Sequence, residues 1–456
     1  MARLWFPVAA AALLAMGLSE PTATASEWKA AIAKVKITPS KPVRMGGFAS
    51  RKHPSEGVLS DLWAKALAVQ DRDGHRIVLI TVDVNNISRQ ISMFVCQALA
   101  QKFDLPRSAI ALNASHTHSG PAMGDRAYYT FSPQEHRDLR EYTENLKRQL
   151  VDVATDALTH LEPARLSWTT TRATFAVNRR NNRPADIERL KAEGKLRGPV
   201  DHDVPVLMVR SEDGKLKVVL CGYACHATTL STYFISADWP GEAQIALEQS
   251  LPGAIAMTWI GCGGDQNPAP RGKVAHARQH GKELASAVLA VLDQGKPIRG
   301  TLKQVYHEFP LPFASIPTRK ELQDRLSNKD RYEAARAQRL LEYLDKHGKI
   351  YDTYPYPIQV WKLGDGPLWI LLGGEVVVDY ALRLKAELGR ESTWVAGYCN
   401  DVLAYIPSER VLREGGYEGG TAMRLYGHPS PWARGIEQRI IKQIHEQIQT
   451  LGIASR

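Results

Sequence analysis

The chain has 456 residues, of which 44% are hydrophobic and 23% are charged, and its formal net charge is +10. This is the composition of an ordinary globular protein with a sizeable core, large enough for one large domain or two smaller ones. Lysine and arginine are interleaved with acidic residues and do not alternate with aromatic side chains. The sequence therefore argues against a nucleic-acid partner, while peripheral contact with an anionic membrane stays open.

The first 25 residues have the pattern of a secretory signal peptide. Arg3 supplies a positive charge, residues 5–18 are mostly apolar, and Ala23-Thr24-Ala25 offers a small-residue cleavage site. The apolar run is shorter than the roughly 20 residues that span a bilayer, which argues against a membrane anchor. We therefore expect an exported protein, secreted or periplasmic, whose mature part is residues 26–456.

Short apolar runs alternate with helical stretches along the mature chain. The runs are typical of strands buried on both faces and cover residues 76–84, 109–112, 217–223, 254–260 and 368–372. Helical periodicity covers residues 90–103, 139–161, 240–249, 273–292 and 433–449. A charged helix or helix hairpin is expected over 319–349, facing solvent or, alternatively, covering the site. The pattern predicts an α/β fold in which a mixed, mostly buried β-sheet is layered with α-helices in a single large catalytic domain.

The five cysteines cannot all pair within one chain, and they include no second close pair that would complete a four-cysteine zinc site. Several of them lie in apolar runs, where thiols are often part of the core. The sequence is compatible with one disulfide, whose partners it does not identify.

Four of the five predicted strands end in loops that carry His, Asp or Glu, and polar groups at strand ends are where chemistry collects in such folds. His116 and His118 are two residues apart in one loop, so both rings can face the same cavity. Histidine is the commonest metal ligand and the usual proton shuttle near neutral pH.

Three further residues at strand ends are ambiguous by themselves. His226 can be a ligand oriented by Thr228 and Thr229, or a core histidine. Glu375 follows two glycines and is expected to open a helix that runs to about residue 388, so a helix-capping role competes with metal binding. Tyr405 can be an ordinary core aromatic.

Taken in chain order, these segments resemble the neutral ceramidase family, exported or lumenal zinc enzymes that split ceramide into sphingosine and a fatty acid. The resemblance is carried by the histidine loop His116-Thr117-His118-Ser119-Gly120-Pro121 and covers most of residues 30–430. Further matching segments are Gly46-Gly47-Phe48, Gly57-Val58, Asn178-Arg179, Ser236-Ala237-Asp238, Gly264-Asp265, Gly374-Glu375, Asn400 to Tyr405, and Tyr417-Glu418-Gly419.

The resemblance implies a catalytic zinc ion and assigns roles to particular residues. Its ligands would be His116, His226, Glu375 and Tyr405, among which tyrosine is the unusual donor. His118 would lie beside the metal, and Arg179 and Tyr417 would line the substrate site. Asp265 either orients a ligand or a water molecule, or serves only as a turn residue.

Two departures from the family point to a different substrate. Where ceramidases carry a catalytic serine in a GDxSP-like segment, this chain has Asn267, which can hydrogen-bond but cannot form an acyl-enzyme. The chain also ends soon after the region that matches the catalytic domain, without room for the C-terminal immunoglobulin-like domain of ceramidases.

The sequence therefore predicts a zinc-dependent hydrolase that cleaves an amide or ester of a small-molecule, lipid or glycan substrate by metal-activated water. In this mechanism His118 shuttles the proton and Arg179 stabilises developing negative charge. Alternatives are a hydrolase of carbohydrates, suggested by Asn113, Asn267 and Asn400, and a non-catalytic binding protein on the same fold. The substrate, the number of subunits and the identity of the metal beyond zinc as first choice are not determined at this level.

Overall fold

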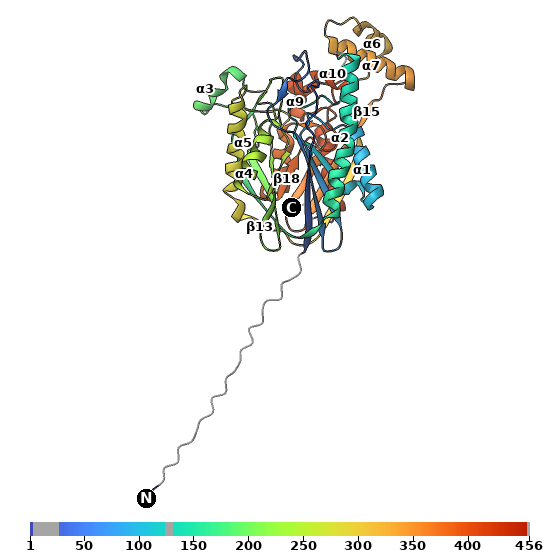
Figure 1. The fold of residues 1–456 in the computed structure, drawn as a ribbon. Coiled ribbons are helices and arrows are strands. Elements are labelled where there is room, and N and C mark those ends of the chain that lie inside the picture. The colour runs from blue at the N-terminus through green and yellow to red at the C-terminus, as the bar shows by residue number, and fades with distance from the viewer. Residues whose placement is uncertain (3–26, 124–130, 454–456) are drawn as a thin grey trace.

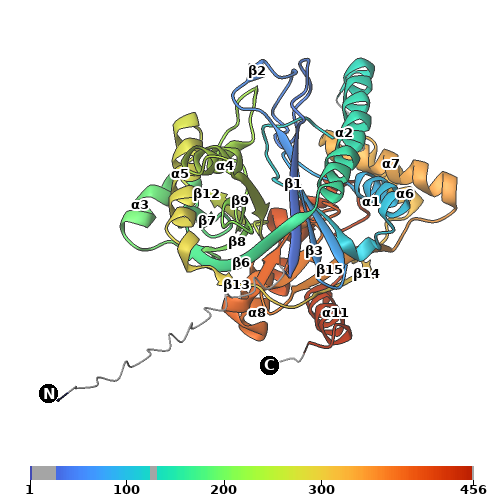
Figure 2. The ribbon, with the colours of Figure 1, turned by 60° about the horizontal axis from the view of Figure 1, so that its bottom comes forward.

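The computed structural model describes residues 1–2, 27–123 and 131–453 (Figure 1). The predicted signal peptide lies almost entirely outside the described residues. The described part is built on two β-sheets that stack face to face, with helices on the outer face of each (Figure 2).

The larger sheet has nine strands, mixed parallel and antiparallel. In spatial order its strands are β11 (Ile255–Ile260), β9 (Leu216–Tyr223), β8 (Asp203–Ser211), β6 (Glu162–Arg172), β1 (Trp28–Lys36), β3 (Trp63–Asp71), β4 (Arg76–Val82) and β5 (Ile110–Ala114), with β13 (Lys296–Pro297) pairing beside β6. The second sheet has four strands, β14 (Leu302–Pro312), β15 (Thr353–Leu363), β16 (Leu368–Leu372) and β18 (Thr393–Ala396).

Side-chain alternation along the strands explains why both sheets are covered on two faces. In β4, Ile77 and Leu79 face the space between the sheets, whereas Val78, Ile80 and Val82 face the helices. The core between the sheets is rich in tryptophan, and its indole rings include Trp28, Trp259, Trp361, Trp369 and Trp394. Because a strand has a period of two residues, a continuous apolar run is what buries both faces at once.

Four helices cover the outer face of the large sheet, namely α1 (Arg89–Phe103), α2 (Pro133–Thr159), α4 (Asp238–Ser250) and α5 (Val274–Leu289). The outer face of the second sheet packs against α8 (Val378–Leu388) and α11 (Ile436–Thr450). Helix α2 begins with a capping box between Ser132 and Glu135, which satisfies two backbone N–H groups that the first turn leaves free. The resulting order of layers is helix, sheet, sheet, helix.

Most of the remaining elements are short and lie at the end of the sheets where the polar loops gather. They are the paired strands β2 (Gly57–Val58) with β10 (Phe234–Ile235), β7 (Ala176–Asn178) with β12 (Gln266–Pro268), and β17 (Glu375–Val376) with β19 (Tyr405–Ile406), and the helices α3 (Ile187–Ala192), α6 (Arg319–Arg325), α7 (Arg331–His347), α9 (Glu409–Glu414) and α10 (Met423–Tyr426).

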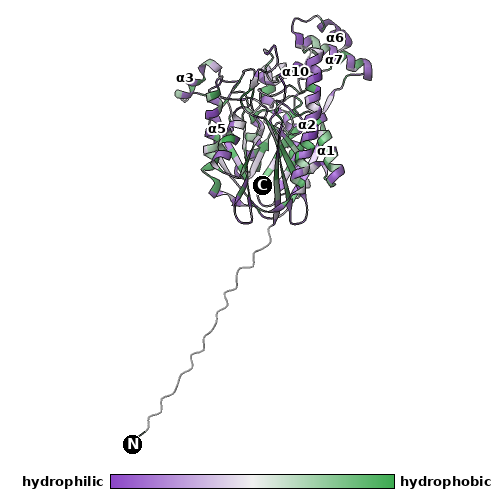
Figure 3. Cartoon of the chain, in the orientation of Figure 1, coloured by the Kyte–Doolittle hydropathy of each residue, from purple (hydrophilic) through white to green (hydrophobic). Residues whose placement is uncertain are grey.

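The predicted fold class is confirmed, and every predicted strand and helix is present with small shifts at its ends. The charged segment over 319–349 is a hairpin of α6 and α7 whose outer faces are hydrophilic (Figure 3). All five cysteines are buried and unpaired, so no disulfide forms among them. Within the described ranges no helix is long and apolar enough to cross a membrane.

The prediction that Glu375 opens a helix is wrong. Glu375 lies in β17, and α8 begins only at Val378, after Val377 in the capping position. The helix begins later because β17 pairs with β19. In this pairing the backbone N–H of Glu375 donates to the carbonyl of Ala404, so Glu375 has a strand conformation. The carboxylate of Glu375 is therefore not a helix cap.

Candidate metal centre

The four predicted ligands converge at one end of the two sheets. His116 follows β5 and His226 follows β9, so both leave the carboxyl ends of strands of the large sheet. The parallel pair β17 and β19 places Glu375 directly opposite Tyr405. Neighbouring backbone ladders thus bring together side chains that lie far apart in the sequence.

The polar atoms of these side chains lie within hydrogen-bonding distance of one another. The Oε2 atom of Glu375 is 3.1 Å from the Nε2 atoms of both His116 and His226. The Nε2 atom of His226 is also 3.3 Å from the hydroxyl of Tyr405. All four residues are buried.

Backbone carbonyls fix both histidine rings from behind. The Nδ1–H of His116 donates to the carbonyl of Asn85 at 2.5 Å, and the Nδ1–H of His226 donates to the carbonyl of Gly263 at 2.6 Å. A ring that donates from Nδ1 presents the lone pair of Nε2 to the opposite side, as metal-binding histidines do. His116 also has a left-handed backbone, with φ 56°, which is uncommon for a residue with a side chain and turns the loop after β5.

This arrangement fits a divalent cation. Two Nε2 lone pairs and an ionised carboxylate are all acceptors, and acceptors this close to one another need a proton or a cation between them. Burial lowers the pKa of His226 to about 4, which favours its neutral, ligand-competent form. Burial acts to raise the pKa of Glu375, but the neighbouring His116 and His226 hold it well below its usual range, so the carboxylate stays charged.

His118 lies at the edge of this cluster. Its Nε2 atom is 3.2 Å from that of His116, and its ring packs edge-on against Phe48 with centroids 5.0 Å apart. Burial, followed by the charges of His116 and His226, lowers the pKa of His118 well below its usual value. His116, His118 and His226 form a group that could hold a metal ion, with ligand atoms within 4.8 Å of one another. Two ligand sets are therefore open: the three histidines, or His116 and His226 with Glu375 and Tyr405.

Arg179 links the cluster to its surroundings. Its guanidinium donates to the hydroxyl of Tyr405 at 3.0 Å, to Glu418 at 2.7 Å and to the Oδ1 of Asn267 at 3.4 Å. Asn267 also accepts from the hydroxyl of Thr228 at 3.3 Å, so both bonds fall on its oxygen. Asn267 is thus held against the proposed site by Arg179.

Asp265 lies behind the ligand loops and joins them. Its carboxylate accepts from the side chain of Asn178 at 3.0 Å, the side chain of Gln266 at 2.9 Å and the backbone N–H of Val378 at 2.9 Å. Burial raises its pKa. These bonds connect β7, β12 and the first turn of α8. Asp265 therefore has a structural role in holding these elements together.

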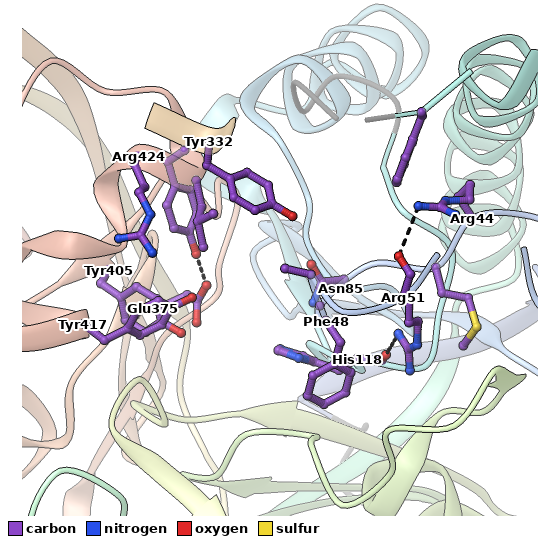
Figure 4. A pocket seen from close by; sticks show the side chains of 16 residues that line it. Arg44, Phe48, Arg51, Asn85, His118, Tyr332, Glu375, Tyr405, Tyr417 and Arg424 are labelled. Carbon is purple, nitrogen blue, oxygen red and sulfur yellow. Dashed lines mark hydrogen bonds between the residues drawn. The ribbon is translucent and has the colours of Figure 1, made fainter. Parts of the chain in front are cut away.

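A cavity of about 340 Å³ opens directly over the cluster (Figure 4). His118, Glu375, Tyr405 and Tyr417 lie in its wall. The rest of the wall consists of Arg44, Met45, Gly47, Phe48, Ala49, Arg51, Asn85, Phe131, Tyr332, Arg424, Leu425 and Tyr426. Tyr332 comes from α7, so the hairpin that was expected mainly to face solvent also supplies one wall of the cavity.

The predictions about the residues that surround the proposed ligands are wrong in two respects. His226 is oriented by the carbonyl of Gly263, not by Thr228 or Thr229, because the chain after β11 folds back behind the ring. Asn113 and Asn400 are almost fully buried and bond to backbone groups of neighbouring strands, so they cannot meet a substrate hydroxyl. They serve to join the two sheets.

Sequence reasoning also missed residues that touch the ligands. The hydroxyl of Tyr426 donates to Glu375, and the ring of Tyr398 packs on that of His116 with centroids 4.6 Å apart. Tyr398 has a left-handed backbone, with φ 56°. Neither tyrosine belongs to a recognisable motif: Tyr426 ends α10 and lies in the cavity wall, whereas Tyr398 comes from the segment after β18.

The fold and the site define a class: an α/β protein with two stacked sheets and a buried histidine–carboxylate centre at the strand ends, capable of holding a metal ion. The sequence profile of the family described as neutral/alkaline non-lysosomal ceramidase, N-terminal, matches residues 31–262. The chain belongs to this family.

Known relatives agree with this assignment. The chain is 24% identical over 227 residues to neutral ceramidase B of Dictyostelium discoideum and 22% identical over 235 residues to the neutral ceramidase of Drosophila melanogaster. These alignments cover 47% and 49% of this chain, but only 30% and 32% of the relatives, so it matches about a third of their length. The crystal structure of neutral ceramidase from Pseudomonas aeruginosa has the same fold, with a TM-score of 0.70 at 19% identity over 94% of this chain and 76% of that one. A ceramidase complexed with C2 gives 0.71 at 18% identity, with the same coverage of both chains.

Proposed function

We propose that this chain is an exported, zinc-dependent hydrolase that cleaves an amide or ester bond of an acyl compound other than ceramide. The observation that carries the proposal is the convergence of His116, His226, Glu375 and Tyr405 at the floor of a cavity with a largely apolar and aromatic wall. Apolar clefts with a few convergent polar groups are the usual form of small-molecule sites.

His116, His226, Glu375 and Tyr405 would hold the zinc ion, and His118 would remain free of it. A zinc ion bound there supplies Lewis-acid chemistry, since it lowers the pKa of water and polarises a carbonyl oxygen. Asn267 cannot act as a nucleophile, so water must attack the acyl carbon directly.

The chain's own side chains then have distinct tasks. The partly buried, neutral imidazole of His118 can accept a proton on one side of the reacting bond and pass it to the leaving amine or alcohol. Arg179 donates to the hydroxyl of Tyr405. Its positive charge would stabilise the negative charge that develops on the substrate oxygen beside Tyr405 during the reaction. Tyr417 packs against Tyr405 with ring centroids 5.3 Å apart and closes that side of the cavity.

One set of variants separates the two candidate ligand sets. Glu375→Gln and His226→Ala should lose zinc, measured by elemental analysis of the purified protein. His118→Ala should keep about one zinc per chain and lose turnover of N-acyl and ester substrates. His160→Ala, at an exposed position on the surface, is the matched control and should change neither quantity.

The results decide between three outcomes. Loss of zinc in His118→Ala, with retention in Glu375→Gln, would assign the metal to the three histidines instead. Full turnover by His118→Ala would remove its role in proton transfer. A zinc-loaded protein that cleaves no acyl compound in the panel would overturn the proposed function and leave the binding-protein alternative.

A further inference from the structure

The cavity over the metal centre has an unbalanced charge. Three arginines line it: Arg44 and Arg51 lie together on one side and Arg424 lies on the other (Figure 4). Glu375 is the one acidic residue among the described residues of the wall. Its carboxylate is already engaged by two histidines and by Tyr426, and it is committed to the metal under the proposed function.

Among the described residues, the ion pairs of Arg44 and Arg424 are made with acids outside the cavity wall. The Nε of Arg44 is 3.7 Å from Glu135, and the Nε of Arg424 is 3.0 Å from Asp330. Neither of these acids lines the cavity. A guanidinium has five N–H donors in a flat fork, so these contacts leave donors on both residues for a ligand.

Arg51 has no carboxylate partner within the described part of the chain. It is only 6% exposed, and it donates to the carbonyls of Gly46, His118 and Thr232. Burial lowers its pKa to about 10, because the charged guanidinium is removed from water. A buried charge without a counterion is costly, so an anion that enters the cavity would be stabilised there.

Aromatic and aliphatic side chains lie between these charges. The guanidinium of Arg44 lies 4.4 Å from the ring centre of Phe131, and that of Arg51 lies 5.0 Å from the ring centre of Phe48. Tyr332 and Leu425 extend the same wall. Such a surface accepts a hydrocarbon chain, while the arginine forks pair with carboxylate, sulfonate or phosphate oxygens.

We propose that this cavity selects an anionic acyl substrate: a compound with a hydrocarbon chain and, near its scissile amide or ester, a carboxylate, sulfonate or phosphate group whose charge is balanced by the arginines of the wall, Arg44, Arg51 and Arg424. The inference rests on the proposed function for the identity of the bond that is cleaved. Such a substrate differs from ceramide, whose head group carries no charge. A change of substrate would account for the divergence of this chain from other members of the family.

The test compares lauroyl amides with two anionic amine parts and one neutral amine part. The zinc-loaded protein is given N-lauroylglycine, N-lauroyltaurine and the neutral N-lauroylglycinamide, and kcat/KM is measured for each. We expect at least about a tenfold preference for an anionic compound, the size of one charge-assisted hydrogen bond. The comparison between carboxylate and sulfonate shows which anion the arginines prefer.

Variants connect that preference to the cavity. Arg44→Gln and Arg424→Gln should each lower the anionic-to-neutral ratio of kcat/KM by about tenfold, mainly through KM. Arg424 is the more exposed of the two and serves if Arg44→Gln does not fold. Lys346→Gln removes one positive charge from the exposed surface of α7 and should leave the ratio unchanged.

A binding measurement keeps the inference testable apart from turnover. Calorimetric titration with dodecyl phosphate and with dodecanol should give tighter binding of the phosphate, weakened by the same two arginine variants. Equal binding of both ligands, or preferential cleavage of the neutral amide, overturns the inference while leaving the hydrolase proposal intact. Tight, arginine-dependent binding of dodecyl phosphate without any hydrolysis supports the anion site and overturns the hydrolase proposal.

Discussion

Gly47 offers a sharp test of how the chain positions His118. Its backbone has φ +88°, a left-handed conformation that favours glycine. A Cβ atom added there would lie 2.4 Å from Cγ, 2.5 Å from Nδ1 and 2.6 Å from Cβ of His118. These distances are far inside van der Waals contact, and the Cβ of His118 is not a mobile chain end. Gly47→Ala should therefore displace the imidazole.

Gly74→Ala is the matched control for this substitution. Gly74 also has φ +88°, but an added Cβ would meet no atom within 4 Å. Both variants carry the backbone penalty, about 1–2 kcal/mol. Gly47→Ala carries in addition the overpacking cost of moving His118, about 1–3 kcal/mol. The difference between the two variants isolates the contact with His118.

Urea unfolding followed by tryptophan fluorescence measures both free energies of unfolding, and turnover is measured on the same samples. If His118 carries the proton, a displacement of about 1 Å should lower kcat of Gly47→Ala by about 10²-fold, with Gly74→Ala near the parent rate. Equal destabilisation of the two variants within about 0.5 kcal/mol, with equal turnover, would refute the reasoning.

Three further predictions follow from buried charges. Burial raises the pKa of Asp83 from 3.8 to about 6, so the folded state binds a proton more tightly than the unfolded state, and ionising Asp83 lowers the free energy of unfolding as pH rises from about 4 to 6. Asp83→Asn lacks this loss, and its stability relative to the parent should rise by up to about 3 kcal/mol between pH 3.5 and 7.5 in urea titrations. Lys385 bonds Asp201 at 2.6 Å and Asp203 at 3.2 Å in the interior, so Lys385→Met should cost about 3 kcal/mol, whereas Lys215→Met at the surface should change little. Chelation of the bound metal should lower the melting temperature, and zinc should restore it; loss of a metal present at a thousand times its Kd removes about 4 kcal/mol.

Each of these has a result that contradicts it. A parent-minus-variant difference for Asp83→Asn that does not change with pH would mean that the carboxyl is not desolvated in the folded state. Equal effects of the two lysine substitutions would show that the interior pairs are solvated. A melting temperature that neither chelator nor zinc moves would argue against a cation among the buried histidines.

Asn267 is held through its oxygen by Arg179 and Thr228, so the side chain is tied into the network that also contacts Tyr405. Under the proposed function, an asparagine at this place leaves the attack on the acyl carbon to water. The burial of Asn113 and Asn400 removes most of the earlier support for a carbohydrate substrate, which leaves an acyl compound as the favoured substrate class.

The sequence by itself determined the layered fold and the loops that carry the chemistry. Continuous apolar runs such as residues 76–84 identify strands because burial on two faces leaves no room for polar residues, and that constraint is local. The His116 loop and the Glu375 segment were recognisable through their resemblance to the family, which is carried by short motifs of neighbouring residues.

The tertiary structure alone decided which of these residues meet. Glu375 faces Tyr405 through the pairing of β17 with β19, an interaction between distant segments that no local pattern records and that also moved the start of α8. The backbone carbonyls of Asn85 and Gly263 orient the histidine rings. Because every residue has a backbone carbonyl, the sequence does not indicate which ones accept these bonds. Likewise, Arg424 shares one cavity with Arg44 and Arg51 only because the chain folds these distant segments together, so the charge of that cavity could not be predicted from composition.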